Sequence, residues 1–209
     1  MIDIIPGSFE QDFSAIEERL QSVEGVVDWA QIDIADETLV PAKSLLEFEK
    51  FGELAKKISL EAHLMVANPE KYIRPLVDAG FRRLIAHVEC NDPRLFLDAA
   101  KYESVEVGLA VDGATEIEQI EPFLEEIDVV LVMTVEAGAS GEPFLPETVE
   151  KIRLIHQNLP NLPIEVDGGI NDQTVKLVKD AGATRAVSTS YIFKDPKRVA
   201  EAIEHLQNA

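Results

Sequence analysis

Residues 164–170 read Ile-Glu-Val-Asp-Gly-Gly-Ile, a short apolar run that stops at a carboxylate and two glycines. A β-branched run of this kind is typical of a buried strand, with Asp167 at its carboxyl end. Gly168 and Gly169 leave backbone N–H groups open to the close approach of an anion. An acid after a strand is also an ordinary turn residue. The functional interpretation gains weight because the same order, a strand followed by a polar group, recurs along the chain.

Segments typical of strands and of helices alternate through the whole sequence. The expected strands are 2–6, 29–34, 60–66, 83–88, 105–111, 129–135, 164–166 and 186–187. The expected helices are 13–23, 45–58, 69–79, 93–102, 117–126, 146–159, 172–181 and 196–206. About eight strand–helix units without a linker favour an α/β fold, a single-domain (β/α)8 TIM barrel over residues 1–209. An open doubly wound sheet is the alternative, but no Gly-x-Gly-x-x-Gly follows the first strand.

Charge and composition narrow the classes of partner. The formal net charge is −20, which argues against binding nucleic acid or an anionic membrane through bulk electrostatics. No apolar run approaches the ~20 residues that span a bilayer. The single cysteine, Cys90, fits a reducing cytoplasm, where we expect the protein to reside. A phosphorylated substrate would be repelled by the overall field, so it would need local donors.

Polar residues at the expected strand ends are the candidates for chemistry, because barrels carry their active sites at that edge. Asp33 and Asp167 follow strands far apart in the order and could face each other, while His63 ends a third strand. Two carboxylates and an imidazole can hold a divalent cation, which would polarise a substrate carbonyl while the carboxylates move a proton. Taken singly, His63 is more often a hydrogen-bonded structural residue and Met65 more often core.

Small-residue loops provide the candidate phosphate site. They follow the sixth, seventh and eighth expected strands, and barrels often bind phosphate after strands seven and eight. The backbone N–H groups expected to contribute belong to Gly138, Gly141, Gly168, Gly169 and Ser190, with Thr189 beside them. One such loop alone is a weak signal, since flexible turns supply most of them.

The chain resembles the ribulose-phosphate 3-epimerase family nearly from end to end. The matching stretches include Asp28-Trp-Ala-Gln-Ile-Asp33, His63-Leu-Met65, Asn68-Pro-Glu-Lys-Tyr-Ile73, Gly108-Leu-Ala110, Asp128-Val-Val-Leu-Val-Met133 and Ile164 to Ile170. The resemblance implies an isomerase of the pentose phosphate pathway that converts D-ribulose 5-phosphate to D-xylulose 5-phosphate at C3. It also implies a cytoplasmic homo-oligomer.

In that family two histidines and two aspartates hold a divalent metal, and the aspartates exchange the C3 proton through a metal-stabilised enediolate. The resemblance assigns these roles to Asp33, Asp167 and His63, with Zn, Fe, Mn or Mg as the ion, and it gives substrate contacts to Ser8 and Met65. Gln31 stands where the family has its other ligand histidine. An amide oxygen can ligate a hard cation but replaces imidazole poorly on zinc or iron.

Other departures keep alternatives open. Ala35 replaces a methionine of the family, Glu136-Ala137 replaces an Asn-Pro pair, and Thr189 replaces a glycine at a position whose backbone is expected to disfavour a β-branched residue. One alternative is a catalytically silent relative that binds a phosphorylated ligand or a partner. Another is a hexulose-phosphate epimerase or lyase on the same scaffold.

Overall fold

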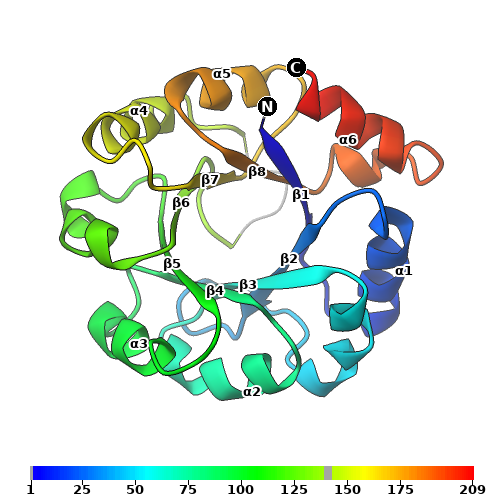
Figure 1. Cartoon of the computed structure of the whole chain (residues 1–209), viewed down its shortest axis with the longest axis horizontal. Helices are drawn as coiled ribbons and strands as arrows, with labels where there is room; N and C mark the ends of the chain where they lie inside the picture. Colours follow the sequence, from blue (N-terminus) through cyan, green and yellow to red (C-terminus); the bar gives the residue numbers. More distant parts are fainter. Residues whose placement is uncertain (1, 139–142) are drawn as a thin grey trace.

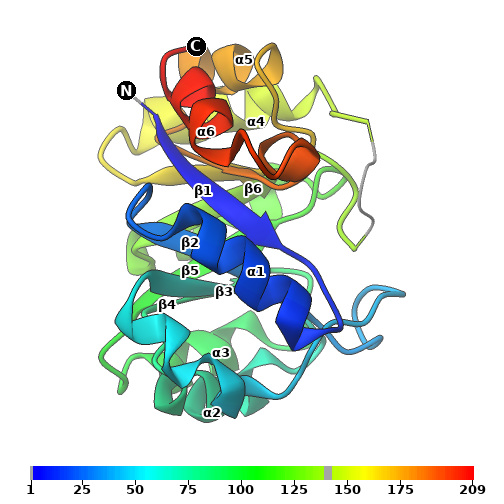
Figure 2. The same ribbon diagram turned by 90° about the vertical axis from the view of Figure 1, so that its right-hand side faces the viewer.

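Eight parallel strands form a closed barrel in the order β1 to β8. The computed structural model describes residues 2–138 and 143–209. The strands are β1 (Asp3–Ser8), β2 (Trp29–Ala35), β3 (Ser59–Met65), β4 (Arg83–His87), β5 (Glu106–Val111), β6 (Val129–Met133), β7 (Ile164–Asp167) and β8 (Arg185–Ser188). Figure 1 looks along the barrel, and Figure 2 shows it from the side. The (β/α)8 prediction is therefore confirmed.

Helices surround the barrel on its outside (Figure 1). The α-helices are α1 (Phe13–Val23), α2 (Ile73–Asp78), α3 (Pro93–Ala100), α4 (Thr148–Asn158), α5 (Thr174–Ala181) and α6 (Val199–Gln207). Asp12 caps α1 by accepting a hydrogen bond from Ser14 N, and Asp92 caps α3 through Leu95 N. Gly182 ends α5 in the left-handed conformation, as a glycine cap should.

Two expected helices are replaced by short 3₁₀ segments. The region 45–58 contains Phe48–Gly52 and Leu54–Lys56, and the region 117–126 contains Ile117–Gln119 and Glu121–Glu126. Gly52 weakens a continuous α-helix in the first region, because glycine has low helix propensity. Pro122 interrupts the second, because it lacks the N–H that the α-helical hydrogen bond needs.

The inside of the barrel has an apolar side and a polar side. Buried side chains of β4, β5 and β6 form one apolar cluster that includes Ile85, Ala110 and Leu131. The strands β2, β3, β4 and β7 contribute polar side chains, which are Gln31, Asp33, Glu61, His63, Arg83, His87, Glu165 and Asp167. The outward residues of all strands pack in the larger core beneath the helices.

Arg83 lies inside the barrel and is only 1% exposed. Its guanidinium lies 3.9 Å from the ring centroid of Trp29, bonds to Glu61, and donates to Glu106 at 2.8 Å. A further contact with Glu165 measures 3.6 Å. Buried carboxylates need such partners, because an unpaired buried charge is costly.

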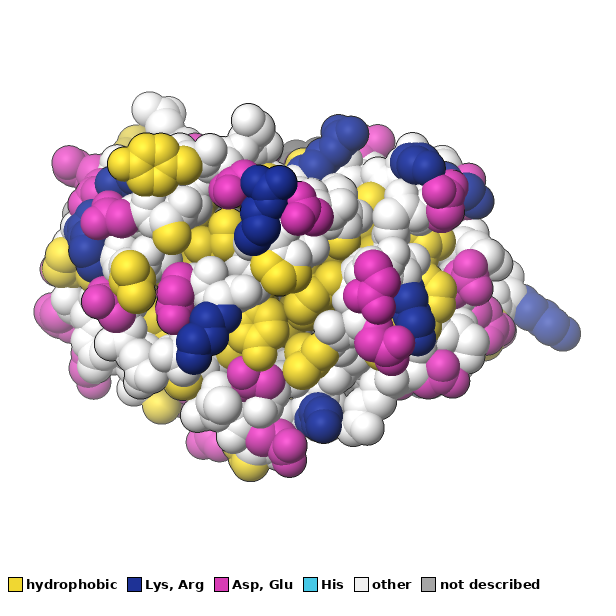
Figure 3. Space-filling model, turned by 90° about the horizontal axis from the view of Figure 1, so that it is seen from below, with side chains coloured by type: hydrophobic (Ala, Val, Ile, Leu, Met, Phe, Trp, Pro, Cys, Tyr) yellow, Lys and Arg dark blue, Asp and Glu magenta, His cyan; other side chains and the backbone are white. Residues whose placement is uncertain are grey.

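The outer surface mixes charge types on the face seen in Figure 3, where acidic and basic side chains surround an apolar strip. Within residues 2–138 and 143–209, no helix is long and apolar enough to cross a membrane.

Candidate active site

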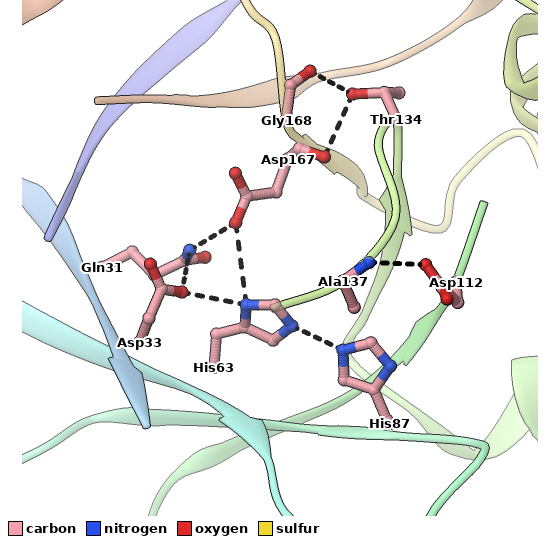
Figure 4. A network of polar contacts seen from close by, with 9 residues as sticks. All are labelled: Gln31, Asp33, His63, His87, Asp112, Thr134, Ala137, Asp167 and Gly168. Atoms are coloured by element: carbon pink, nitrogen blue, oxygen red, sulfur yellow. Dashed lines mark hydrogen bonds and ion pairs between the residues drawn. The ribbon is translucent and has the colours of Figure 1, made fainter. Parts of the chain in front are cut away.

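Asp33, His63 and Asp167 meet at the carboxyl ends of their strands (Figure 4). Asp33 and His63 are register partners on β2 and β3. Nδ1 of His63 lies 3.0 Å from Asp33 Oδ1 and 3.6 Å from Asp167 Oδ2. Thr134 holds the end of β7, because its hydroxyl donates to the Asp167 carbonyl at 3.0 Å. The side chains that the sequence placed together are thus in contact across the barrel mouth.

Gln31 joins the two carboxylates. Its Nε2 donates to Asp33 Oδ1 at 2.9 Å and to Asp167 Oδ2 at 2.7 Å, while its Oε1 is buried without a hydrogen-bond partner in the described chain. The residue is fully buried, so neither atom is open to solvent. One amide nitrogen therefore lies between two acids that belong to different strands.

Burial shifts the protonation of this cluster. Desolvation raises the pKa of Asp33 from 3.8 to about 7, against the hydrogen bond from Gln31. Desolvation, with repulsion from Asp33, raises the pKa of Asp167 to about 7 as well. Burial and the nearby His87 lower the pKa of His63 to about 3. Two close acids of this kind share a proton near neutral pH, and their imidazole neighbour is uncharged.

A line of hydrogen bonds leads from His63 away from the acids. His63 Nε2 lies 2.8 Å from His87 Nε2, and His87 Nδ1 lies 2.9 Å from Glu89 Oε2. Burial alone would raise the pKa of Glu89, but the hydrogen bonds that it accepts, first from His87, lower the pKa to about 2. Glu89 Oε1 accepts from Asp112 N at 2.8 Å. Sequence reasoning left the role of His87 open and missed Glu89, although both lie at or just after the end of the same strand.

The ligand atoms of the three central residues suit a divalent cation. One oxygen or nitrogen from each of Asp33, His63 and Asp167 lies within 4.8 Å of the others. Turning the Gln31 amide by half a turn would present its unpartnered Oε1 to the same point. Zn, Fe and Mn ions bind mixed sets of oxygen and imidazole ligands. Mg prefers oxygen ligands alone, so it matches this set less well. The residues present fit a cation with three ligands and an optional fourth.

A cavity opens beside this cluster and contains most of the expected phosphate residues. It is lined by Phe9, Asp33, His63, Met65, Met133, Val135, Gly138, Asp167, Gly168, Gly169, Ile170, Val187, Ser188, Thr189 and Ser190. Gly168 has φ 115°, and a Cβ there would strike the side chain of Val135, so only glycine fits this turn. The small-residue loops after β7 and β8 thus share one cavity with the acids.

Two residues that we expected at the substrate site, Ser8 and Gly141, are not seen to line the cavity. Ser8 is not among the lining residues, and its hydroxyl is buried without a partner in the described chain, while the neighbouring Phe9 faces the cavity. Gly141 lies outside the described residues.

The expected strain at Thr189 is absent, which corrects the sequence-based concern. Among the described residues, Glu37 is the non-glycine residue with positive φ, so Thr189 has an ordinary backbone. A Cβ added at Gly7 would lie 2.5 Å from Thr189 Oγ1. The threonine side chain therefore takes up space that a larger residue 7 would need.

Comparison with known proteins identifies the family of this chain. The profile described as "Ribulose-phosphate 3 epimerase family" matches residues 3–193. The chain belongs to the ribulose-phosphate 3-epimerase family. It is 31% identical to ribulose-phosphate 3-epimerase of Schizosaccharomyces pombe, over 97% of this chain and 92% of that protein. It is 33% identical to the cytoplasmic isoform of Oryza sativa subsp. japonica, over 96% and 92%.

Solved structures support the fold. The 3-hexulose-6-phosphate synthase of Salmonella typhimurium matches with a TM-score of 0.75 at 18% identity, over 99% of each chain. The KGPDC of Streptococcus mutans matches with a TM-score of 0.74 at 13% identity, over 100% of this chain and 96% of that one. At these identities the likeness concerns the barrel alone. Family membership supports an epimerase, an isomerase by class.

Proposed function

We propose that this protein interconverts D-ribulose 5-phosphate and D-xylulose 5-phosphate by epimerisation at C3. The observation that carries the proposal is the pair Asp33 and Asp167, which both accept a hydrogen bond from one amide nitrogen, at 2.9 and 2.7 Å. Inverting one carbon requires a base on one face and an acid on the other. Two carboxyl groups with pKa values of about 7 can fill both roles near neutral pH.

The ionised aspartate removes the C3 proton, and the electron pair of the C–H bond moves toward the C2 carbonyl to give an enediolate. The protonated aspartate then delivers its proton to the other face of C3. The two acids exchange protonation states in each turnover, so the reverse reaction starts with their roles exchanged. A divalent cation held by Asp33, His63 and Asp167 would supply positive charge for the oxygens of this intermediate.

The loops beside the acids would hold the phosphate. Gly168 and Gly169, with Ser190 and Thr189, line the same cavity as the catalytic pair. Their backbone N–H groups offer donors without lysine, which suits a chain whose net charge of −20 would otherwise repel a phosphate. Gly138 adds a third loop to the lining.

The test is proton exchange with solvent. Purified protein, reconstituted separately with Zn²⁺, Fe²⁺, Mn²⁺ and Mg²⁺, is incubated with D-ribulose 5-phosphate in deuterated water. We expect deuterium at C3 and formation of D-xylulose 5-phosphate, both read by NMR. Hexulose 6-phosphate run in parallel reports sugar length. Absence of deuterium at C3 with every metal would remove the assignment.

A silent relative that only binds a phosphorylated ligand is the second candidate. The position of Gln31 favours it, because the amide nitrogen lies between the carboxylates where a cation would bind. Thermal stabilisation by ribulose 5-phosphate without turnover supports that function, and measurable turnover eliminates it.

A further inference from the structure

We propose that Glu89 and His87 are positioning residues that keep the His63 proton on Nε2, so that its Nδ1 lone pair faces Asp33 and Asp167. This inference deepens the proposed function and rests on it, since the lone pair matters for the cation site. His87 and Glu89 do not line the cavity and lie behind His63. Their effect on chemistry would therefore pass through His63.

The direction of the hydrogen bonds follows from Glu89. An ionised carboxylate can only accept, so the nitrogen that faces Glu89 Oε2 at 2.9 Å, His87 Nδ1, must carry a proton. When His87 is neutral, its other nitrogen is an acceptor, and this Nε2 lies 2.8 Å from His63 Nε2. His63 Nε2 then donates, which leaves His63 Nδ1 unprotonated.

That unprotonated nitrogen points at the acids, 3.0 Å from Asp33 Oδ1. Two groups that only accept cannot share this contact without a proton or a cation between them. A metal-binding histidine needs this arrangement, and a carboxylate on its far nitrogen commonly supplies it. Here a second histidine stands between the carboxylate and the ligand.

Glu89→Gln should reverse the donor and acceptor roles in the hydrogen bonds that link residue 89, His87 and His63, while the side chains keep their positions. Asp112 N donates to Glu89 Oε1 at 2.8 Å, so it would hold the amide oxygen of the variant at that position. The amide NH₂ would then occupy the place of Oε2 and donate to His87 Nδ1. His87 would carry its proton on Nε2 and donate to His63, whose own proton would move to Nδ1 and face the acids.

Two measurements test this on the full chain. Long-range ¹H–¹⁵N NMR of metal-free, ¹⁵N-histidine-labelled protein reads each tautomer, with His156→Gln and His205→Gln for assignment. We expect His63 protonated on Nε2 in the wild type and on Nδ1 in Glu89→Gln. Chelator competition then measures Zn²⁺ affinity, which should fall about 10- to 100-fold in Glu89→Gln.

Glu136→Gln is the control, because it removes one negative charge from the exposed residue beside Ala137 without touching His87. Its zinc affinity should stay within about threefold of the wild type. The inference is overturned if wild-type His63 carries its proton on Nδ1, as a doubly protonated His87 would require. Equal zinc affinity in Glu89→Gln and the wild type overturns it too. The wild-type spectrum shows which nitrogen of His63 carries the proton, so it tests the inference even if the variant fails to fold. Deuterium exchange at C3 in the wild type tests the proposed function independently.

Discussion

Replacing Gln31 by histidine should strengthen metal binding, and the structure sets the size of the effect. An ion entering between Asp33 and Asp167 must displace the Gln31 NH₂ from both carboxylates, at 2.9 and 2.7 Å. Hydrogen bonds to charged groups are worth about 1.5–3 kcal/mol each, so the two together oppose binding by at least about 3 kcal/mol. Removing that competition corresponds to an increase of about 150-fold in affinity. Histidine also offers a better nitrogen ligand for zinc.

The assay is chelator competition with Zn²⁺ on metal-free protein at pH 8, with the deuterium exchange rate at C3 measured alongside. Gln31→Ala separates the two contributions, because it removes the competing donor without adding a ligand. We expect Gln31→Ala to bind zinc about 150-fold more tightly than the wild type, and Gln31→His to bind it most tightly. Weaker binding in Gln31→Ala would show that the amide already serves as a ligand, which would refute the competition argument.

Three further predictions concern the acids and the buried arginine. Asp33→Asn and Asp167→Asn should each lower C3 exchange by at least about 10²-fold, measured by NMR, because each removes one proton-transfer group. Both aspartates have a pKa raised from 3.8 to about 7, so between pH 4 and 7 the folded state holds protons that the unfolded state has released. The free energy of unfolding of metal-free protein should therefore fall as pH rises through this range and level off above it, and Asp33→Asn should flatten the slope seen in urea titrations. Arg83→Met should cost about 3–5 kcal/mol in urea unfolding because it leaves Glu61 buried without its partner, whereas Arg74→Met, at an exposed position, should leave the free energy of unfolding nearly unchanged.

The alternation of apolar runs with helical periodicity predicted the barrel, because each strand–helix unit is a local pattern. Placing polar strand ends at one edge then predicted that Asp33, His63 and Asp167 would meet, as they do. Helix type was predicted less well, since Pro122 and Gly52 change the hydrogen-bond pattern within segments whose apolar spacing looks helical.

The hydrogen bond between His63 and His87 could not be predicted in the same way. It depends on how side chains from β3 and β4 turn inside the barrel, and strand-end position does not report this. The pair His87 and Glu89, with one residue between them at the end of a strand, was the available signal. The orientation of the Gln31 amide is likewise set by its two carboxylate neighbours rather than by its own sequence context.

The placement of the buried Arg83 bears on the proton transfer that we propose for the two aspartates. Arg83 neutralises Glu61 on the polar side of the barrel, and its ion pairs within the described chain are with Glu61, Glu106 and Glu165 rather than with Asp33 or Asp167. Glu61 itself contributes repulsion that raises the pKa of both aspartates. A basic side chain placed beside the aspartates would lower both values and fix both groups as bases, which would leave no acid to complete an inversion. Among the described residues neither aspartate forms an ion pair with a lysine or an arginine, and under the proposed mechanism this leaves both groups able to exchange a proton near neutral pH.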